Sequence, residues 1–143
     1  MTKENKELVA IDVCGRIHSN VVFKVGEYNY TVCGYMSTDT QPIKAYFFKD
    51  TDGDRENPIY IQFPLKSYKP YLRPLGSMTD EETVEFRRAG GVISYDPVNN
   101  TYAMAAFSAD AYDWLNKNHF DFRGMIERGL AIEVTEENNP YNS

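Results

Sequence analysis

The sequence predicts an α+β domain. We expect a curled antiparallel sheet of about four strands, with an N-terminal helix before it and a C-terminal helical part plus one added strand after it. Alternating apolar runs between turn residues predict the strands, and capped helical patterns after residue 79 predict the helical part. The chain has 143 residues, of which 42% are hydrophobic, so one core can form. We therefore expect a single domain over residues 1–143.

Residues 3–16 have the spacing of a helix. Thr2 can cap its first turn, and Leu8, Ile11 and Gly15 fall on one face. The run LVAIDV inside this segment also suits a strand. The sequence therefore favours a helix here and leaves a strand as the alternative.

Residues 20–63 are expected to form the β-rich core. The run NVVFKVGEYNYTVCGYM alternates on both sides of Gly26-Glu27, which is the pattern of a tight hairpin. KAYFFK (44–49) and PIYIQF (58–63) add two strands, joined by a polar turn. Short twisted strands hide their edges by curling, so we expect an SH3-like half-barrel.

The segment 64–78 differs from the strands before it. Pro70 and Pro74 bracket the sequence YLR, and each proline pushes the residue before it toward an extended conformation. We expect this segment to run as a stiff, extended strap over the sheet.

Residues 79–135 are expected to form a helix, a hairpin, a second helix and a strand. Thr79 and Glu82 have the T-x-x-E spacing of a capping box, and the pair GG that follows RRA ends the first helix. GVISYDPVNNTYAMAAF then predicts a hairpin that turns at residues 97–100.

The second helix is expected to begin after Ser108 and to run to about Asn118. Its apolar face comprises Ala111, Trp114 and Leu115. The last residues, 136–143, read as a polar tail that frays.

The stretch NHFDFRGMIERGLAIEV places four polar side chains close together, as a catalytic site would. A short helix explains most of them, because Asp121 can cap it and Gly129 can end it, with Arg128 in its last turn. Its apolar face comprises Phe122, Met125 and Ile126. Arg123 and Glu127 are four residues apart and can pair on the exposed side. LAIEV then predicts a strand that adds to the sheet.

The charge and the apolar pattern disfavour two classes of partner. The net charge is −6, and no stretch is densely basic, so a grip on nucleic-acid phosphates is not expected. No apolar run is long enough to span a membrane, and the N-terminus does not have the pattern of a secretory signal. Cys14 and Cys33 are read as reduced thiols. We therefore expect a cytoplasmic protein.

No metal or cofactor site is expected. Asp50, Asp52 and Asp54 are spaced like the first ligands of a calcium loop, but the required Gly and Glu are absent, so a solvated turn is favoured. His18 and His119 are about a hundred residues apart and do not form a local metal motif. A pair of one cysteine and one histidine is left open, because such partners need only meet in space.

Seven tyrosines crowd the predicted sheet and strap. They are Tyr28, Tyr30, Tyr35, Tyr46, Tyr60, Tyr68 and Tyr71. Tyrosine is enriched at interfaces, but it also suits half-buried strands, and the strand preference is the favoured explanation. The residues chosen as candidates for an interaction site are Tyr68, Tyr71, Arg73, His119 and Arg123.

Two stretches, YKPYLRPLGSMTDEE and HFDFRGMIERGLAIE, resemble a pattern found in a group of small, largely uncharacterised proteins of gut anaerobes, their phages and mobile elements. The pattern reads K-P-Y-L-R-P-L-S-S-M-T-x-E-E and then H-x-D-x-R-G-L-I-x-x-G-L-A. This chain departs from it at Gly76, where Ser is usual, and at Met125, where Leu is usual. The resemblance implies an intracellular accessory protein and no known activity.

These observations favour a non-enzymatic accessory protein of the phage or mobile-element type that binds another protein. The alternative is a small enzyme or a binder of a small ligand such as a nucleotide signal, which needs a pocket with convergent polar groups. A nucleic-acid binder built on the curled sheet is the third possibility, and the acidic composition disfavours it. The sequence predicts neither the oligomeric state nor the partner.

Overall fold

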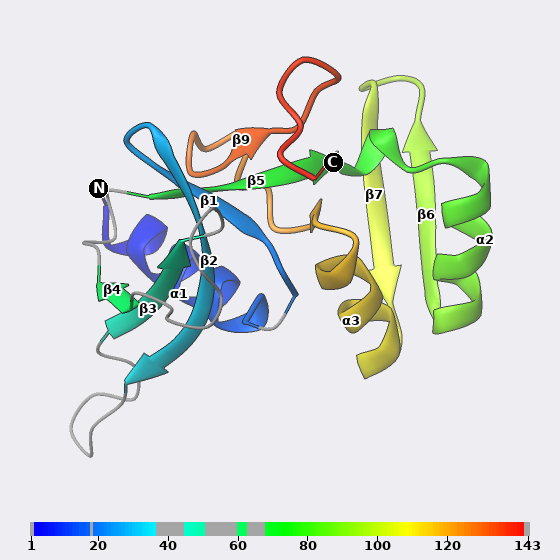
Figure 1. Ribbon diagram of the computed structural model, residues 1–143. Coiled ribbons are helices and arrows are strands. Elements are labelled where there is room, and N and C mark those ends of the chain that lie inside the picture. The colour runs from blue at the N-terminus through cyan, green and yellow to red at the C-terminus, as the bar shows by residue number, and fades with distance from the viewer. Residues whose placement is uncertain (1, 18, 37–44, 51–59, 63–67, 142–143) are drawn as a thin grey trace.

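The computed structural model describes residues 2–17, 19–36, 45–50, 60–62 and 68–141. Its architecture is α+β, as predicted. Strand β5 (Lys69–Pro74) links two parts of the molecule (Figure 1). Helix α1 and strands β1 to β4 lie on one side of the picture, and α2, α3 and the hairpin β6–β7 lie on the other.

Helix α1 (Lys3–Gly15) resolves the choice between helix and strand at the N-terminus. The Thr2 hydroxyl accepts a hydrogen bond from the Asn5 amide at 3.1 Å, which is the predicted cap. The predicted face was wrong, because Ile11 is 59% exposed. The helix instead buries Val9, Asp12 and Val13.

The predicted hairpin is confirmed by β1 (Val22–Val25) and β2 (Tyr28–Met36), which pair antiparallel with Val25 opposite Tyr28. Strands β3 (Ala45–Asp50) and β4 (Tyr60–Gln62) continue the antiparallel order. The predicted turn between them, at 51–59, lies outside the described residues.

The segment predicted as a strap over the sheet is instead a strand within it. Strand β5 is extended, but it pairs antiparallel with β1 and parallel with β8 (Phe120–Asp121) and β9 (Ile132–Glu133). The prolines forced an extended backbone without preventing pairing, because the residues between them keep their amide hydrogens. The resulting sheet has seven strands in the described residues, and it is not closed into a barrel.

The helical part follows the local signals of the sequence. Helix α2 (Asp80–Ala89) has the Thr79–Glu82 capping box, and the Ser108 hydroxyl caps α3 (Ala109–Lys117) by accepting from Ala111. Between the helices, β6 (Gly91–Asp96) and β7 (Thr101–Ala106) form a separate two-stranded sheet with Tyr95 opposite Tyr102.

The helix predicted after Asp121 does not form. The Asp121 carboxylate does cap the chain, since it accepts from the amides of Met125 at 3.0 Å and Ile126 at 2.9 Å. However, the segment is a series of turns rather than an α-helix. Gly124 has a φ of 73°, which an α-helix does not allow, so the helical run is interrupted one turn after its cap. The added strand after it is confirmed as β9.

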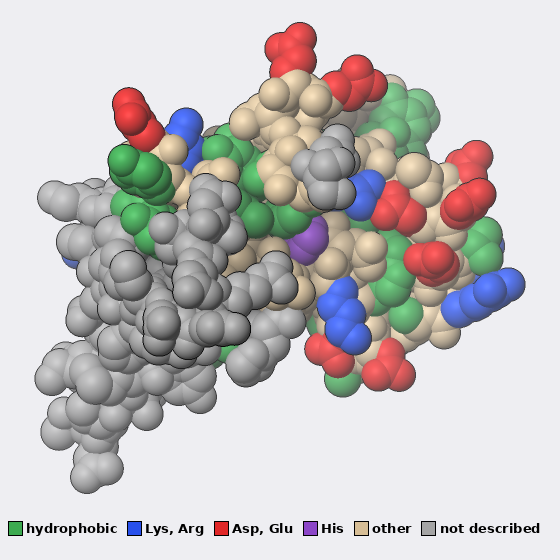
Figure 2. Space-filling view, viewed as in Figure 1, with side chains coloured by type: hydrophobic (Ala, Val, Ile, Leu, Met, Phe, Trp, Pro, Cys, Tyr) green, Lys and Arg blue, Asp and Glu red, His purple; other side chains and the backbone are tan. Residues whose placement is uncertain are grey.

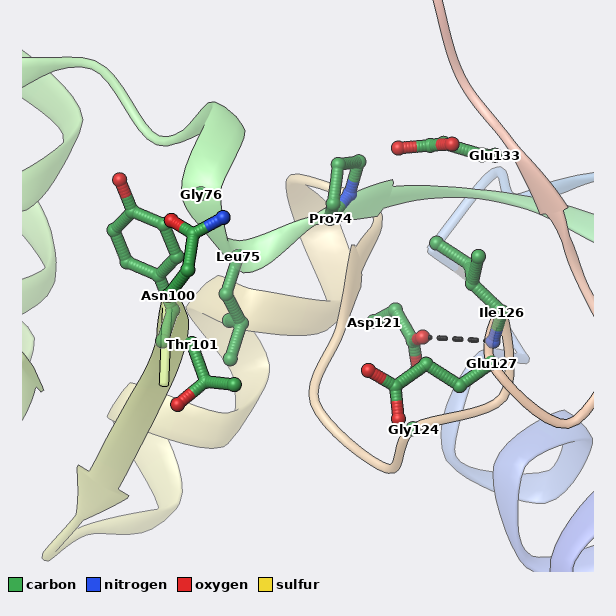
Figure 3. A pocket seen from close by; sticks show the side chains of 11 residues that line it. Pro74, Leu75, Gly76, Asn100, Thr101, Asp121, Gly124, Ile126, Glu127 and Glu133 are labelled. Atoms are coloured by element: carbon green, nitrogen blue, oxygen red, sulfur yellow. Dashed lines mark hydrogen bonds between the residues drawn. The ribbon is translucent and has the colours of Figure 1, made fainter. Parts of the chain in front are cut away.

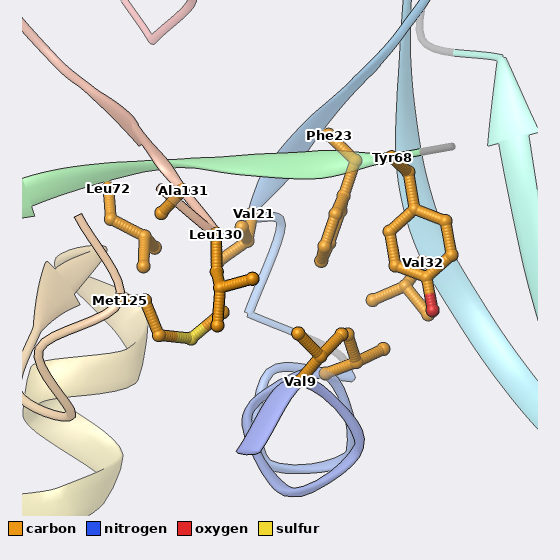
Figure 4. Close-up of a cluster of buried hydrophobic side chains, with 10 residues drawn as sticks. Val9, Val21, Phe23, Val32, Tyr68, Leu72, Met125, Leu130 and Ala131 are labelled. Atoms are coloured by element: carbon orange, nitrogen blue, oxygen red, sulfur yellow. The ribbon is translucent and has the colours of Figure 1, made fainter. Parts of the chain in front are cut away.

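Two apolar clusters fill the interior. The first lies between α1, the sheet and the turn after Asp121, and Figure 4 shows Val9 of the helix facing Phe23, Val32 and Tyr68. The second joins α2, α3 and β8, and it comprises Phe86, Ala111, Leu115 and Phe120. The helix α3 face predicted from the sequence is therefore the buried one.

Candidate functional site

Two of the five candidate interaction residues lie in the interior. The Tyr68 side chain is 3% exposed and packs against Phe23 with ring centroids 5.7 Å apart. The Tyr71 side chain is 5% exposed. Both tyrosines are therefore core residues of the folded chain and do not present their rings to a partner.

Arg73 is held in place by its own chain. Its guanidinium donates two hydrogen bonds to the Glu82 carboxylate, at 2.7 and 2.8 Å, and lies 4.2 Å from the centroid of the Phe120 ring. The bonds from Arg73 lower the pKa of the Glu82 carboxyl. The arrangement connects β5 to the capping box of α2, so the visible role of Arg73 is to orient that helix.

His119 lies in a stack with Tyr141 from the C-terminal segment. The ring centroids are 3.8 Å apart with an interplanar angle of 13°, and Nε2 is 3.1 Å from the Ser19 carbonyl oxygen. Burial lowers the pKa of His119 to about 4, so the ring is neutral at pH 7. Because its Nε2 is bonded to Ser19 and one face is covered by a ring, His119 has the surroundings of a structural residue.

The predicted fraying of the tail is wrong as far as Tyr141. The Tyr141 hydroxyl accepts from the Val22 amide at 3.0 Å and donates to the Tyr71 carbonyl at 2.8 Å. It thus bridges β1 and β5 next to the Phe23–Pro70 pair of the ladder. Burial raises the pKa of this hydroxyl, so it stays protonated and can make both bonds.

Arg123 pairs with α1 rather than with Glu127, so the predicted surface pair was wrong. Its guanidinium donates to Asp12 at 2.6 Å and lies 4.2 Å from the centroid of the Phe122 ring. Asp12 also accepts from Arg16 at 2.9 Å, and both of these side chains are fully buried. One buried carboxylate therefore serves two arginines, and Glu127 is left without the predicted cation.

The described residues contain no group of three or more His, Cys, Asp or Glu side chains that could hold a metal ion. Cys14 is a half-buried free thiol. The remaining candidates for chemistry, His18, the Cys33 side chain and the calcium-like run 50–54 beyond its first residue, lie outside the described residues. Nothing in the described part of the chain assembles a catalytic constellation.

The structure does contain a pocket, with a volume of about 380 Å³. It lies where the end of β5, the turn of the β6–β7 hairpin and the turn segment after Asp121 converge (Figure 3). Its lining comprises Pro74, Leu75, Gly76, Asn100, Thr101, Tyr102, Asp121, Gly124, Ile126, Glu127 and Glu133. None of the five candidate interaction residues is among them, so sequence reasoning missed this site.

The pocket is acidic. Its described lining includes three carboxylates and no Lys, Arg or His. The Asp121 carboxylate is occupied by backbone amides, whereas Glu127 and Glu133 are exposed and take part in none of the ion pairs between described residues. In Figure 3 both glutamates extend toward the hollow from the side opposite Asn100 and Thr101.

One wall of the pocket depends on Gly76. Gly76 lies in the short 3-10 helix η2 (Leu75–Ser77), and a Cβ added there would be 2.7 Å from the Tyr102 ring. The Tyr102 ring also packs on the Tyr95 ring, with centroids 4.8 Å apart, and the Tyr95 hydroxyl donates to Asn100 Oδ1 at 2.6 Å. Gly76 therefore lets the hairpin approach β5, which is a sequence signal for this site.

The hairpin also has an uncovered outer face. Val92 lies opposite Ala105 and Ser94 opposite Ala103, and these residues are exposed. The Phe107 amide donates to the Gly90 carbonyl at 2.9 Å, which extends the ladder, and its side chain is 78% exposed. This strip of uncharged side chains is called the outer hairpin face below.

Comparison with protein-family models, with curated proteins and with solved structures found no match to this chain. In the described residues no helix is both long and apolar enough to cross a bilayer. Acidic side chains are prominent on the described part of the surface in Figure 2, in keeping with a net charge of −6.

Proposed function

We propose that this chain is a non-enzymatic accessory protein, of the phage or mobile-element type and acting in the cytoplasm, that binds a protein partner. The observation that carries the proposal is the outer hairpin face. Val92 is 46% exposed and Phe107 is 78% exposed, and the exposed Ala105 and Ala103 lie opposite Val92 and Ser94. Exposed apolar side chains grouped on one face mark interaction sites more often than isolated exposed residues do.

The geometry of the face suits a partner with a flat, uncharged surface. A two-stranded ribbon presents side chains of alternate residues on one side, and here Val92, Ser94, Ala103 and Ala105 form an uncharged stretch that ends at the Asp96–Thr101 pair. Small side chains allow a partner to approach the backbone closely. We also propose the SH3-like curl that the sequence predicts for β1 to β4, whose strands pair in the order β4-β3-β2-β1.

The supporting experiment compares two exposed valines. A tagged protein carrying Val92→Glu should lose the partner that the unmodified protein captures from the cells that produce it, because the charge must be buried in the complex. Val84→Glu is the matched control, since Val84 in α2 is also 46% exposed and lies outside the face. Equal capture by all three forms would contradict the proposal.

The same samples should be examined by gel filtration. If the outer hairpin face instead joins two copies of this chain, Val92→Glu converts a dimer to a monomer and no other protein is captured. That outcome would show that the face mediates self-association and does not bind a different protein.

A binder of nucleotide signals is not supported. Phosphate groups need cationic side chains or free backbone amides at the site. The described lining of the pocket has no cationic side chain, and the Asp121 carboxylate already accepts from the amides of Met125 and Ile126.

A further inference from the structure

We propose that the acidic pocket is a binding site for an organic cation, meaning an alkylammonium or guanidinium group carried on a short apolar stem. The inference goes beyond the proposed function, because it does not involve the outer hairpin face. It is built on the shape, the charge and the walls of the pocket, which are taken in turn.

The pocket has the size and the apolar floor that a stem requires. Its volume of about 380 Å³ falls in the range typical of small-molecule sites, roughly 300 to 1,000 Å³. Pro74, Leu75 and Ile126 supply apolar lining from two different segments of the chain. A short hydrocarbon stem can therefore leave water on entering the hollow.

The charge of the lining selects a cation. Glu127 and Glu133 are exposed carboxylates on one side of the hollow, and the described lining holds no cationic side chain that could balance them. Two arginines lie near Glu127 in sequence, but Arg123 is paired with Asp12 at 2.6 Å and Arg128 with Glu4 at 3.3 Å. In the folded chain these arginines pair with other carboxylates, so the Glu127 carboxylate is available to a ligand.

The hairpin wall adds an aromatic ring and neutral acceptors. The Tyr102 ring can interact with a cation through its π face, and Thr101 contributes a hydroxyl. This wall is fixed before a ligand arrives, because Tyr102 packs on Gly76 and the Tyr95 hydroxyl holds Asn100 at 2.6 Å. A preformed wall loses little conformational freedom on binding.

Binding is tested by chemical-shift titration of the full chain with two cations, putrescine and agmatine. Uncharged 1,4-butanediol is the control for putrescine, and succinate is the control for charge sign. We expect both cations to shift the NMR resonances of residues that line the pocket. We expect the binding to weaken as salt is added, because salt screens the exposed glutamates. The neutral diol and the dianion should bind more weakly than either cation.

The variants Glu127→Gln and Glu133→Gln remove one charge each and keep the shape. Exposed ion pairs of this kind predict about a two- to fivefold weaker affinity for each change, and about tenfold for the two together. Glu136→Gln combined with Glu137→Gln is the matched control, since both residues are exposed and lie outside the pocket lining. The circular dichroism of all variants checks that the fold is kept.

Three results would overturn the proposal: no shift at millimolar cation, equal binding of butanediol and putrescine, or unchanged affinity in the doubly substituted Glu127/Glu133 variant. A blocked peptide containing one arginine forms the last arm. Binding of agmatine but not of this peptide indicates a free small cation, and tighter binding of the peptide indicates an arginine of a partner. Val92→Glu should leave cation binding unchanged, so failure of this inference and failure of the proposed function are distinguishable.

Discussion

Replacing Tyr141 with Phe removes one oxygen atom from the junction of β1 and β5. In the native chain that hydroxyl accepts from the Val22 amide at 3.0 Å and donates to the Tyr71 carbonyl at 2.8 Å. The phenyl ring should keep its place, because the stack on His119 at 3.8 Å does not use the hydroxyl. The substitution therefore leaves the Val22 amide and the Tyr71 carbonyl next to the edge of a phenyl ring, with no hydrogen-bond partner there.

The expected loss follows from the burial of these two groups. Val22 is 8% exposed and Tyr71 is 5% exposed, so water replaces the lost partners poorly. An unsatisfied buried polar group costs about 1 to 3 kcal/mol, so the free energy of unfolding should fall by about 2 to 4 kcal/mol in total. Against a typical domain stability of about 5 to 15 kcal/mol, this loss is easily measured.

Urea unfolding followed by tryptophan fluorescence is a suitable assay, because Trp114 is the single tryptophan and stacks between Phe86 and Phe120. Tyr112→Phe is the control, since this tyrosine is 44% exposed and its change should cost less than about 0.5 kcal/mol. A Tyr141→Phe protein as stable as this control would refute the bridging role of the hydroxyl.

Three further predictions concern buried charge, close packing and pH. Asp12→Asn should lower the free energy of unfolding by about 3 to 5 kcal/mol, because it leaves the fully buried Arg16 without its carboxylate. Adding Arg16→Met removes the unpaired charge, so the double variant should lose less stability than Asp12→Asn alone. A larger loss in the double variant would contradict this prediction. Gly76→Ala should lower the free energy of unfolding by about 1 to 3 kcal/mol, because the new Cβ would lie 2.7 Å from the Tyr102 ring and the ring must move. The loss should be smaller in a Tyr102→Ala protein. An equal loss with and without the Tyr102 ring would exclude that contact as the cause. The pKa of His119 is lowered to about 4, so the unfolded chain binds its proton first, and stability should fall as pH is lowered from about 6.5 to 4. His119→Asn, which tolerates the positive φ of 64°, should show a smaller fall over that range in urea unfolding, and parallel curves for the two proteins would contradict the assignment.

The parts of the fold that the sequence predicted are those held by bonds between near neighbours. The capping box joins Thr79 and Glu82, three residues apart, and the Ser108 cap reaches Ala111 over the same separation. Such bonds form wherever the local backbone is helical, so residue identity and spacing are sufficient to predict them.

The candidate site was predicted poorly for the opposite reason. Arg123 and Glu127 have the spacing of a helical pair, but Gly124 interrupts the helix between them and Arg123 binds Asp12 instead. Local spacing cannot reveal this exchange, because the preferred carboxylate lies 111 residues away. A glycine at position 76 was compatible with close packing, but only the structure shows that it faces the Tyr102 ring.

By itself the sequence determined the α+β class, the two hairpins, the N-terminal caps of α1, α2 and α3, and the acidic charge. Only the tertiary structure decided that Lys69–Pro74 is a strand within the sheet, that Tyr141 bridges strands 70 and 119 residues away along the chain, and that four separate segments line an acidic pocket. The physical reason is the range of the interactions. Turn and cap geometry depends on a few consecutive residues, whereas strand pairing and pocket walls depend on which distant surfaces pack together when the core is buried.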